Sequence, residues 1–114
     1  MTISIGKVSS PDQGEKQIET YLVREIRKLG GTAYKFNSEQ RRGVPDRLCV
    51  LPGRVVVFVE CKRPGARPRP AQIREMQRLR ETDQLVTWVS TKEEIDSLTK
   101  MIKQGRTNMI KWEG

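Results

Sequence analysis

The sequence contains no histidine, and this absence excludes several common kinds of active site. A protein without imidazole side chains has no histidine base for proton transfer and cannot build a zinc site from histidine and cysteine ligands. Proton transfer and cation binding are therefore left to carboxylates and lysines.

Cysteine is scarce, since Cys49 and Cys61 are the only two, and both fall in predicted strands of one hairpin. A pairing that places Cys49 opposite Val57 separates the two thiols by about four residues along the ladder, roughly 13 Å. Two cysteines that far apart cannot form a disulfide bond. We therefore expect two reduced core thiols in a cytoplasmic protein.

Long apolar runs are also missing. No segment is apolar over a length that would span a membrane, and the N-terminus shows no signal-peptide pattern. We expect a soluble intracellular protein with no membrane partner. Its 114 residues suit one domain over residues 1–114, with one modest core at about residues 12–103 and an extension at each end.

Positive charge is abundant. Twenty-two lysines and arginines against fourteen aspartates and glutamates give a formal net charge of +8. A polyanion such as nucleic acid is the natural partner of a chain with this charge, although a generally basic surface would give the same composition. Charge alone does not separate these two interpretations.

A hydrophobic hairpin lies at the centre of the chain. Residues 46–51 and 55–62 are rich in apolar and β-branched side chains, and Pro52-Gly53 between them is a turn signal. The second strand begins with five apolar residues in a row, which predicts a central strand covered on both faces. Because side chains alternate along a strand, Glu60 and Lys62 share one face and Cys61 lies on the other.

The pairing register decides whether Asp46 joins this polar face. A two-residue turn places Asp46 opposite Val59, on the wrong face of the sheet, whereas one further turn residue places it opposite Glu60. Paired side chains then have Cβ atoms roughly 4.5–5.5 Å apart. Two carboxylates this close raise one another's pKa unless a cation lies between them. The pattern therefore predicts a divalent-metal site at the end of the hairpin.

The residues Gly43-Val44-Pro45-Asp46, followed by Glu60-Cys61-Lys62, resemble the active-site core of the PD-(D/E)xK nuclease superfamily. The wider pattern is similar to the stand-alone VRR-NUC branch of that superfamily, of the phage and bacterial type, and extends from about residue 15 to residue 103. An isolated Asp followed by Glu-x-Lys is a weak signal, but the ordered set is a strong one. The other matching positions are Glu15, Ile18, Glu19, Gly30-Gly31, Tyr34-Lys35-Phe36, Arg47, Phe58-Val59 and Gln72. Cys61 departs from the pattern, since relatives often carry leucine there, but it should face away from the site.

The resemblance implies a restriction-endonuclease-like α/β fold and a set of roles. Asp46, Glu60 and the backbone carbonyl of Cys61 would hold Mg²⁺ or Mn²⁺ through oxygen. Lys62 would position and help deprotonate the attacking water, or stabilise developing negative charge. Gln72 would orient water or phosphate, although a polar residue in the first turn of a helix needs no such role.

Two carboxylates of the first predicted helix are further candidates. Glu15 fits the Glu-x-x-Ile arrangement of the branch, and Glu19 fits the glycine spacing of the wider superfamily. Either would complete the metal coordination or a second metal position. An ordinary solvated glutamate is the alternative for each, and the sequence does not choose between the pair.

The remaining elements follow from periodicity, caps and breakers. The apolar spacing predicts a first helix that ends at Gly30-Gly31. A second helix begins at Pro70, and a last one begins at the capping box of Thr91 to Glu94. Together these signals predict a mixed β-sheet flanked by helices. The expected elements are a helix at about 12–29, a strand at 32–36, the hairpin, a helix at about 70–82, a strand at 85–89 and a last helix after residue 91.

Two polar segments of the chain carry candidate phosphate contacts. The loop before Asp46 contains Arg41 and Arg42, and a proline-rich loop after Lys62 contains three further arginines. Loop arginines are commonly only solvated, but their position next to the site favours contact with a DNA backbone. The three arginines of the second loop are Arg63, Arg67 and Arg69.

We interpret the sequence as a metal-dependent DNA endonuclease that acts as a homodimer on branched DNA, with four-way (Holliday) junctions or flaps as substrates. A nucleic-acid-binding module that has lost catalysis and a purely structural domain are the alternatives. A module that has lost catalysis would lack an active-site residue, and none of Asp46, Glu60 and Lys62 is missing. A purely structural domain gives no reason for two facing carboxylates. Apolar residues near the two ends are the candidate dimer contacts, or an additional strand in the case of the C-terminal ones. They are Ile3, Ile5, Met109, Ile110 and Trp112.

Overall fold

The computed structural model describes the backbone of residues 11–110 and the side chains of residues 14–110. Its helices and strands follow the expected order, and their ends differ from the expected ones by a residue or so, which is ordinary for element boundaries. The predicted contacts at Ile3, Ile5 and Trp112 lie outside the described residues. The elements are α2 (Pro11–Lys28), β1 (Thr32–Lys35), β2 (Arg47–Leu51), β3 (Val55–Cys61), α3 (Pro70–Glu81), β4 (Leu85–Val89), α4 (Lys92–Lys103) and the 3₁₀ helix η1 (Thr107–Met109).

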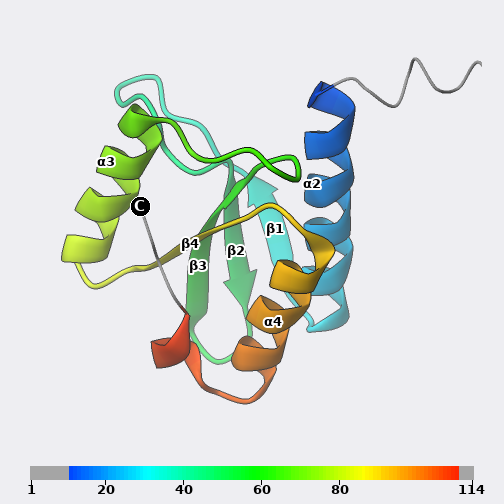
Figure 1. Ribbon diagram of the computed structural model, residues 1–114. Coiled ribbons are helices and arrows are strands. Elements are labelled where there is room, and N and C mark those ends of the chain that lie inside the picture. The colour runs from blue at the N-terminus through cyan, green and yellow to red at the C-terminus, as the bar shows by residue number, and fades with distance from the viewer. Residues whose placement is uncertain (1–10, 111–114) are drawn as a thin grey trace, which may run out of the picture.

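The strands form one mixed sheet in the order β1-β2-β3-β4. The first three pair antiparallel, and β4 pairs parallel to β3 after a crossover through α3. Helices α2 and α4 lie together on one side of the sheet and α3 lies on the other (Figure 1). The predicted α/β fold with a mixed sheet between helices is therefore confirmed.

The hydrophobic core fills the space between the sheet and the pair α2 and α4. Alternate residues of β2 and β3, among them Cys49, Val57 and Val59, are completely buried against Leu22 and Ile95. The apolar residues of both helices recur at helical spacing, so each helix presents one stripe to the sheet. The two thiols lie in this core without a disulfide bond, as expected.

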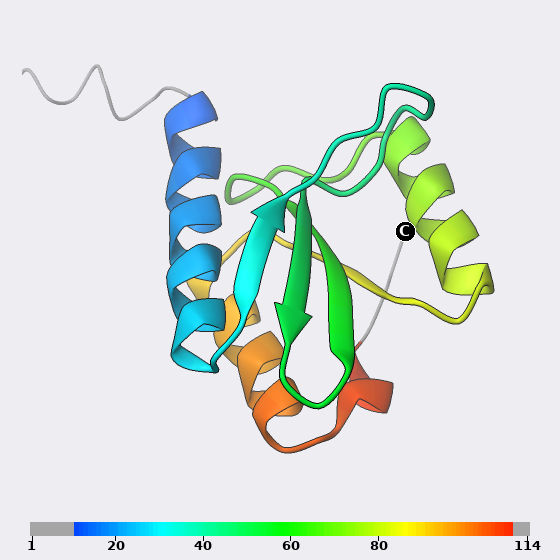
Figure 2. The same ribbon diagram turned by 180° about the vertical axis from the view of Figure 1, so that it is seen from behind.

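The opposite face of the sheet is only partly covered. Helix α3 packs on β4, where Met76 and Val86 are completely buried. Among residues 11–110 no helix lies in front of β1, β2 and β3 (Figure 2), and Tyr34 and Val50 remain 55% and 39% exposed. The prediction that both faces of residues 55–62 are covered was therefore wrong for the part of β3 that α3 does not reach, where Val56 and Phe58 are only half-buried.

The hairpin has the longer turn that the site requires. Leu51 pairs with Val55, and the ladder continues to Arg47 opposite Val59. The next positions outward are Asp46 and Glu60, which by strand alternation lie on the same face of the sheet. The predicted register is thus confirmed, and Cys49 faces Val57 as expected.

The chain after α4 turns back onto the core. Residues Thr107–Met109 form a single 3₁₀ turn, and Ile110 then lies 2% exposed in the core. Ile110 was therefore wrongly assigned to a dimer contact, because an apolar residue near a chain end can equally be needed to close the domain's own core. No additional strand forms among residues 104–110, while Met109 is half exposed.

No helix of the described chain combines the length and apolar character needed to cross a membrane.

Candidate active site

The charged residues at the ends of β2 and β3 converge on one point. The Asp46 carboxylate accepts a hydrogen bond from the backbone N–H of Cys61 over 3.1 Å, and Lys62 Nζ lies 3.3 Å from Glu60 Oε2. Glu60 and Lys62 are 3% and 6% exposed, so this ion pair is almost fully withdrawn from water. The structure brings Asp46, Glu60 and Lys62 together as the sequence predicted.

Gln72 joins this cluster from the first turn of α3. Its amide nitrogen donates to Glu60 Oε2 over 2.9 Å, and its amide oxygen accepts from the backbone N–H of Arg69 over 2.7 Å. The second bond caps the helix and also fixes which end of the amide faces Glu60. Gln72 is therefore oriented by its own helix to donate toward the carboxylates.

Gly43 allows the loop before Asp46 to lie directly on α3. Its φ of +80° belongs to the left-handed region, and a Cβ atom there would lie 2.6 Å from the backbone oxygen of Ala71. Side chains other than hydrogen do not fit such an approach. The glycine of the Gly-Val-Pro-Asp sequence thus brings the loop and Gln72 to the same end of the sheet.

The backbone carbonyl of Cys61 points toward Asp46. In a strand the N–H and C=O groups of one residue point the same way, and the Cys61 N–H is directed at Asp46. The next N–H, that of Lys62, is directed to the other side and donates to Val89 over 2.9 Å. The Cys61 side chain is completely buried in the core, so it faces away from the site as expected.

Burial raises the proton affinity of both site carboxyls. The pKa of Asp46 rises to about 7, first because the group is desolvated and next because of the charges of Glu60 and Glu19. Burial also raises the pKa of Glu60, while the neighbouring Lys62 ammonium opposes that rise. Such a pair holds a proton or a cation in place of two free negative charges.

The two candidate glutamates of α2 have different surroundings. Glu19 Oε2 is held by Arg47 Nε at 3.1 Å and by Lys35 Nζ at 3.2 Å. Glu15 has no hydrogen bond or ion pair with any described residue, and its charge contributes to the raised pKa of both Asp46 and Glu60. Sequence reasoning missed the pairing of Arg47 with Glu19. The signal for this pairing in the sequence was a basic residue, Arg47, directly after Asp46. The Arg47 guanidinium also donates to the carbonyl of Ala33.

The donor chemistry suits a hard divalent cation. Two carboxylates and a carbonyl supply oxygen atoms, which Mg²⁺ and Mn²⁺ prefer. Across the side chains that the structure describes, no cluster of three or more carboxylate, cysteine or histidine groups surrounds a common point. The candidate site therefore consists of the Asp46 and Glu60 carboxylates and backbone oxygen, and Glu15 acts on both carboxylates through its charge.

Known proteins resemble this chain, among them the following two. A solved structure described as "VRR_NUC domain" superposes with a TM-score of 0.70 and 34% sequence identity, covering 79% of this chain and 95% of that one. The chain belongs to the VRR-NUC family. A protein of Acyrthosiphon pisum secondary endosymbiont phage 1, named "Putative nuclease p44", is 60% identical over 65 residues, which are 57% of this chain and 70% of that protein. No family model matches the chain. The family resemblance seen in the sequence is confirmed, and these names support a nuclease function.

The predicted phosphate-binding arginines of this VRR-NUC protein differ in what they contact. Arg41 Nε lies 3.1 Å from both carboxylate oxygens of Glu75, which is almost completely buried, so this pair ties the loop before Asp46 to α3. The Arg67 guanidinium lies over the Trp88 ring, 5.6 Å from its centre. Arg42, Arg63 and Arg69 are exposed. Neither Glu75 nor Trp88 carried a functional signal in the sequence.

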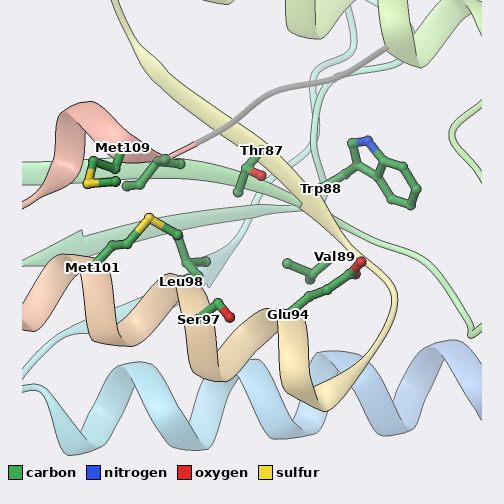
Figure 3. A pocket seen from close by; sticks show the side chains of 9 residues that line it. Thr87, Trp88, Val89, Glu94, Ser97, Leu98, Met101 and Met109 are labelled. Atoms are coloured by element: carbon green, nitrogen blue, oxygen red, sulfur yellow. The ribbon is translucent and has the colours of Figure 1, made fainter.

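A cavity of about 390 Å³ between β4 and α4 is separate from this site (Figure 3). Thr87, Val89, Leu98 and Met101 line it, and it contains none of the carboxylates that meet at the ends of β2 and β3. In the same view the Trp88 ring points away from these side chains. Glu60 is paired with Trp88 across β3 and β4, so the candidate active site lies on the Trp88 side of β4 and we assign this cavity no catalytic role.

Proposed function

We propose that this VRR-NUC protein is a metal-dependent endonuclease that hydrolyses phosphodiester bonds in DNA. The observation that carries the proposal is the half-buried Asp46 beside the buried Glu60, which is paired with Lys62 and accepts a hydrogen bond from Gln72. A structural domain gains nothing from two carboxylates whose pKa values burial raises. Perturbed carboxyls that meet an amine at the end of a sheet are expected of a catalytic site.

The cation would be Mg²⁺ or Mn²⁺. Asp46, Glu60 and the carbonyl of Cys61 would hold it, and Glu15 is the better of the two α2 candidates because Arg47 and Lys35 already occupy Glu19. A bound cation would polarise the scissile phosphate and lower the pKa of an attacking water. Glu19 would instead help to position the site by neutralising the charges of Lys35 and Arg47.

Lys62 would stabilise the negative charge that develops on the phosphate. Its ammonium forms an ion pair with Glu60, and an ammonium group donates hydrogen bonds but has no lone pair to accept a proton. This pairing favours charge stabilisation over the role of general base. Gln72, held in one orientation by its bond to the Arg69 backbone, would fix the position of Glu60 or of the water beside it.

We infer further that the enzyme acts as a homodimer on branched DNA, with four-way junctions as the leading substrate and flaps as the alternative. The described part of the chain is small, and two copies related by a two-fold axis match paired cuts on a two-fold substrate. The net charge of +8 supports a polyanionic partner. Met109, which is half exposed at the end of η1, remains a candidate contact.

The test is cleavage of labelled linear, flap and four-way-junction DNA by purified protein with Mg²⁺, with Mn²⁺ and with EDTA. We expect cleavage only with a cation, faster cleavage of branched DNA than of linear duplex, and loss of most activity in Lys62→Ala. DNA binding without cleavage under all conditions would instead support the lapsed binding module. Light scattering at micromolar concentration, with and without DNA, tests the dimer, and a strict monomer that cuts all substrates equally contradicts this last inference.

A further inference from the structure

Trp88 lies beside the candidate active site, on the strand next to that of Glu60. Its Cα is paired with that of Glu60 across the parallel strands β3 and β4. Paired residues of neighbouring strands point to the same face of a sheet, so Trp88 shares a face with Glu60. Asp46 stands on one flank of Glu60, on the β2 side, and Trp88 stands on the other flank, on the β4 side.

The side chain above Trp88 is an arginine from the proline-rich loop. The guanidinium carbon of Arg67 lies 5.6 Å from the centre of the indole ring, within the range of a cation–π interaction. Pro68, the next residue, is buried, and Ala66 N–H donates to the Arg63 carbonyl over 3.1 Å, so Arg67 lies between a hydrogen-bonded turn and a residue packed into the protein. A guanidinium stacked on a ring keeps its in-plane N–H groups available for a phosphate.

Arg67 differs in this respect from Arg41. Arg41 is paired with the Glu75 carboxylate, which neutralises its charge. Within residues 14–110 no carboxylate pairs with Arg67, and its partner is an uncharged ring. The stacked arginine therefore combines a fixed position beside Glu60 with a positive charge that no described carboxylate neutralises.

We propose that Trp88 is a positioning residue that holds Arg67 to bind a DNA phosphate next to the scissile one, on the β4 side of the site. The proposal rests on the DNA-cleaving function proposed above. Stacking reduces the side-chain entropy that Arg67 loses when it binds a phosphate. Trp88 thus contributes to DNA affinity through Arg67 and carries no charge itself.

A double-mutant cycle tests this coupling. Affinity for a fluorescein-labelled four-way junction is measured by anisotropy, with EDTA present to prevent cleavage, for Arg67→Ala, Trp88→Leu and the double variant. We expect each single variant to weaken binding about tenfold, as for loss of a hydrogen bond to a charged group. The double variant should bind no more weakly than Arg67→Ala.

The salt dependence separates positioning from mere structural support. Arg67→Ala should reduce the slope of log affinity against log salt by about 0.9, the value for one phosphate contact. Trp88→Leu removes no charge but should reduce the slope by a similar amount, while Trp88→Tyr keeps an aromatic face and should retain most of both affinity and slope. The matched control is Arg54→Asn in the distant hairpin turn, where φ is +65° and asparagine fits, and it should change neither quantity.

A second measurement keeps Trp88 in place in case Trp88→Leu does not fold. In a Trp112→Phe background Trp88 is the only tryptophan, and junction DNA should change its emission in the Arg67 protein but much less after Arg67→Ala. Additive losses in the cycle, an unchanged slope in Trp88→Leu, or equal emission changes with and without Arg67 overturn the proposal. Failure of the wild-type protein to cleave with Mg²⁺ or Mn²⁺, with this coupling intact, would refute only the proposed catalysis.

Discussion

Replacing Asp46 by asparagine should stabilise the metal-free protein at alkaline pH, although it removes a proposed catalytic group. The pKa of Asp46 rises from 3.8 to about 7 in the folded protein. A carboxyl whose pKa is raised by folding stabilises the folded state below pH 3.8, and this contribution is lost as pH rises through 7. An asparagine side chain at this position would be neutral at every pH and could still accept the hydrogen bond from the Cys61 N–H.

The size of the effect follows from the change in proton affinity. Each tenfold change in proton affinity is worth about 1.4 kcal/mol, so the rise in the pKa of Asp46 from 3.8 to about 7 corresponds to roughly 4 kcal/mol at most. Partial access of water to Asp46 reduces this free energy. We expect Asp46→Asn to gain about 2–4 kcal/mol of unfolding free energy at pH 8 in EDTA. For a domain of this size that is a rise in Tm on the order of 10 °C.

The assay is thermal and urea unfolding at pH 4, 6 and 8, with EDTA and with Mg²⁺. The stability of the wild-type protein relative to Asp46→Asn should fall from pH 4 to pH 8, and saturating Mg²⁺ should stabilise only the wild-type protein, by about 2.7 kcal/mol at a hundredfold excess over Kd. Asp83→Asn is the control, because Asp83 is exposed and its φ of +70° also suits asparagine. Equal or lower stability of Asp46→Asn at pH 8 in EDTA would refute the reasoning.

Three further predictions concern activity. Glu60→Gln should remove most Mg²⁺-dependent cleavage but not DNA binding, and adding Asp46→Asn should cost little more, as single-turnover rates and binding titrations can show. Gly43→Ala should destabilise the fold by about 2–4 kcal/mol and slow cleavage, since its Cβ meets the backbone of α3; an unchanged unfolding curve contradicts this. Glu15→Gln should raise the Mg²⁺ concentration needed for half-maximal rate more than Glu19→Gln does, and the reverse order would assign the metal position to Glu19.

Much of the site could be predicted because it depends on local pattern. Alternation in β3 places Glu60 and Lys62 on one face, and only the longer turn brings Asp46 to that same face. The cap that begins α4 was equally local, since Glu94 N–H donates to Thr91 Oγ1 over 3.1 Å as the capping box predicts.

Contacts between distant segments could not be predicted in the same way. The pairing of Arg47 with Glu19 depends on how α2 crosses the sheet, and neither residue indicates the other in the sequence. Val56 and Phe58 carry the apolar signal of a covered strand, yet only the placement of α3 decides which strands it covers. Ile110 likewise has the composition of a contact residue, and its burial follows from a turn at Thr107–Met109 that no strong motif marks.

The hairpin turn at residues 52–54 lies at the opposite end of the sheet from the carboxylates (Figure 1), yet its length determines their meeting. Its side chains are exposed and make no contribution to the site, so variation in their identity should be tolerated wherever the new residue accepts the left-handed backbone of Gly53 and Arg54, whose φ angles are +80° and +65°. Variation in their number should not, because a shift of the ladder by one residue would turn Asp46 to the core side and bury a charge there. Among descendants of this sequence, changes in the length of this turn should therefore be far rarer than changes in its composition.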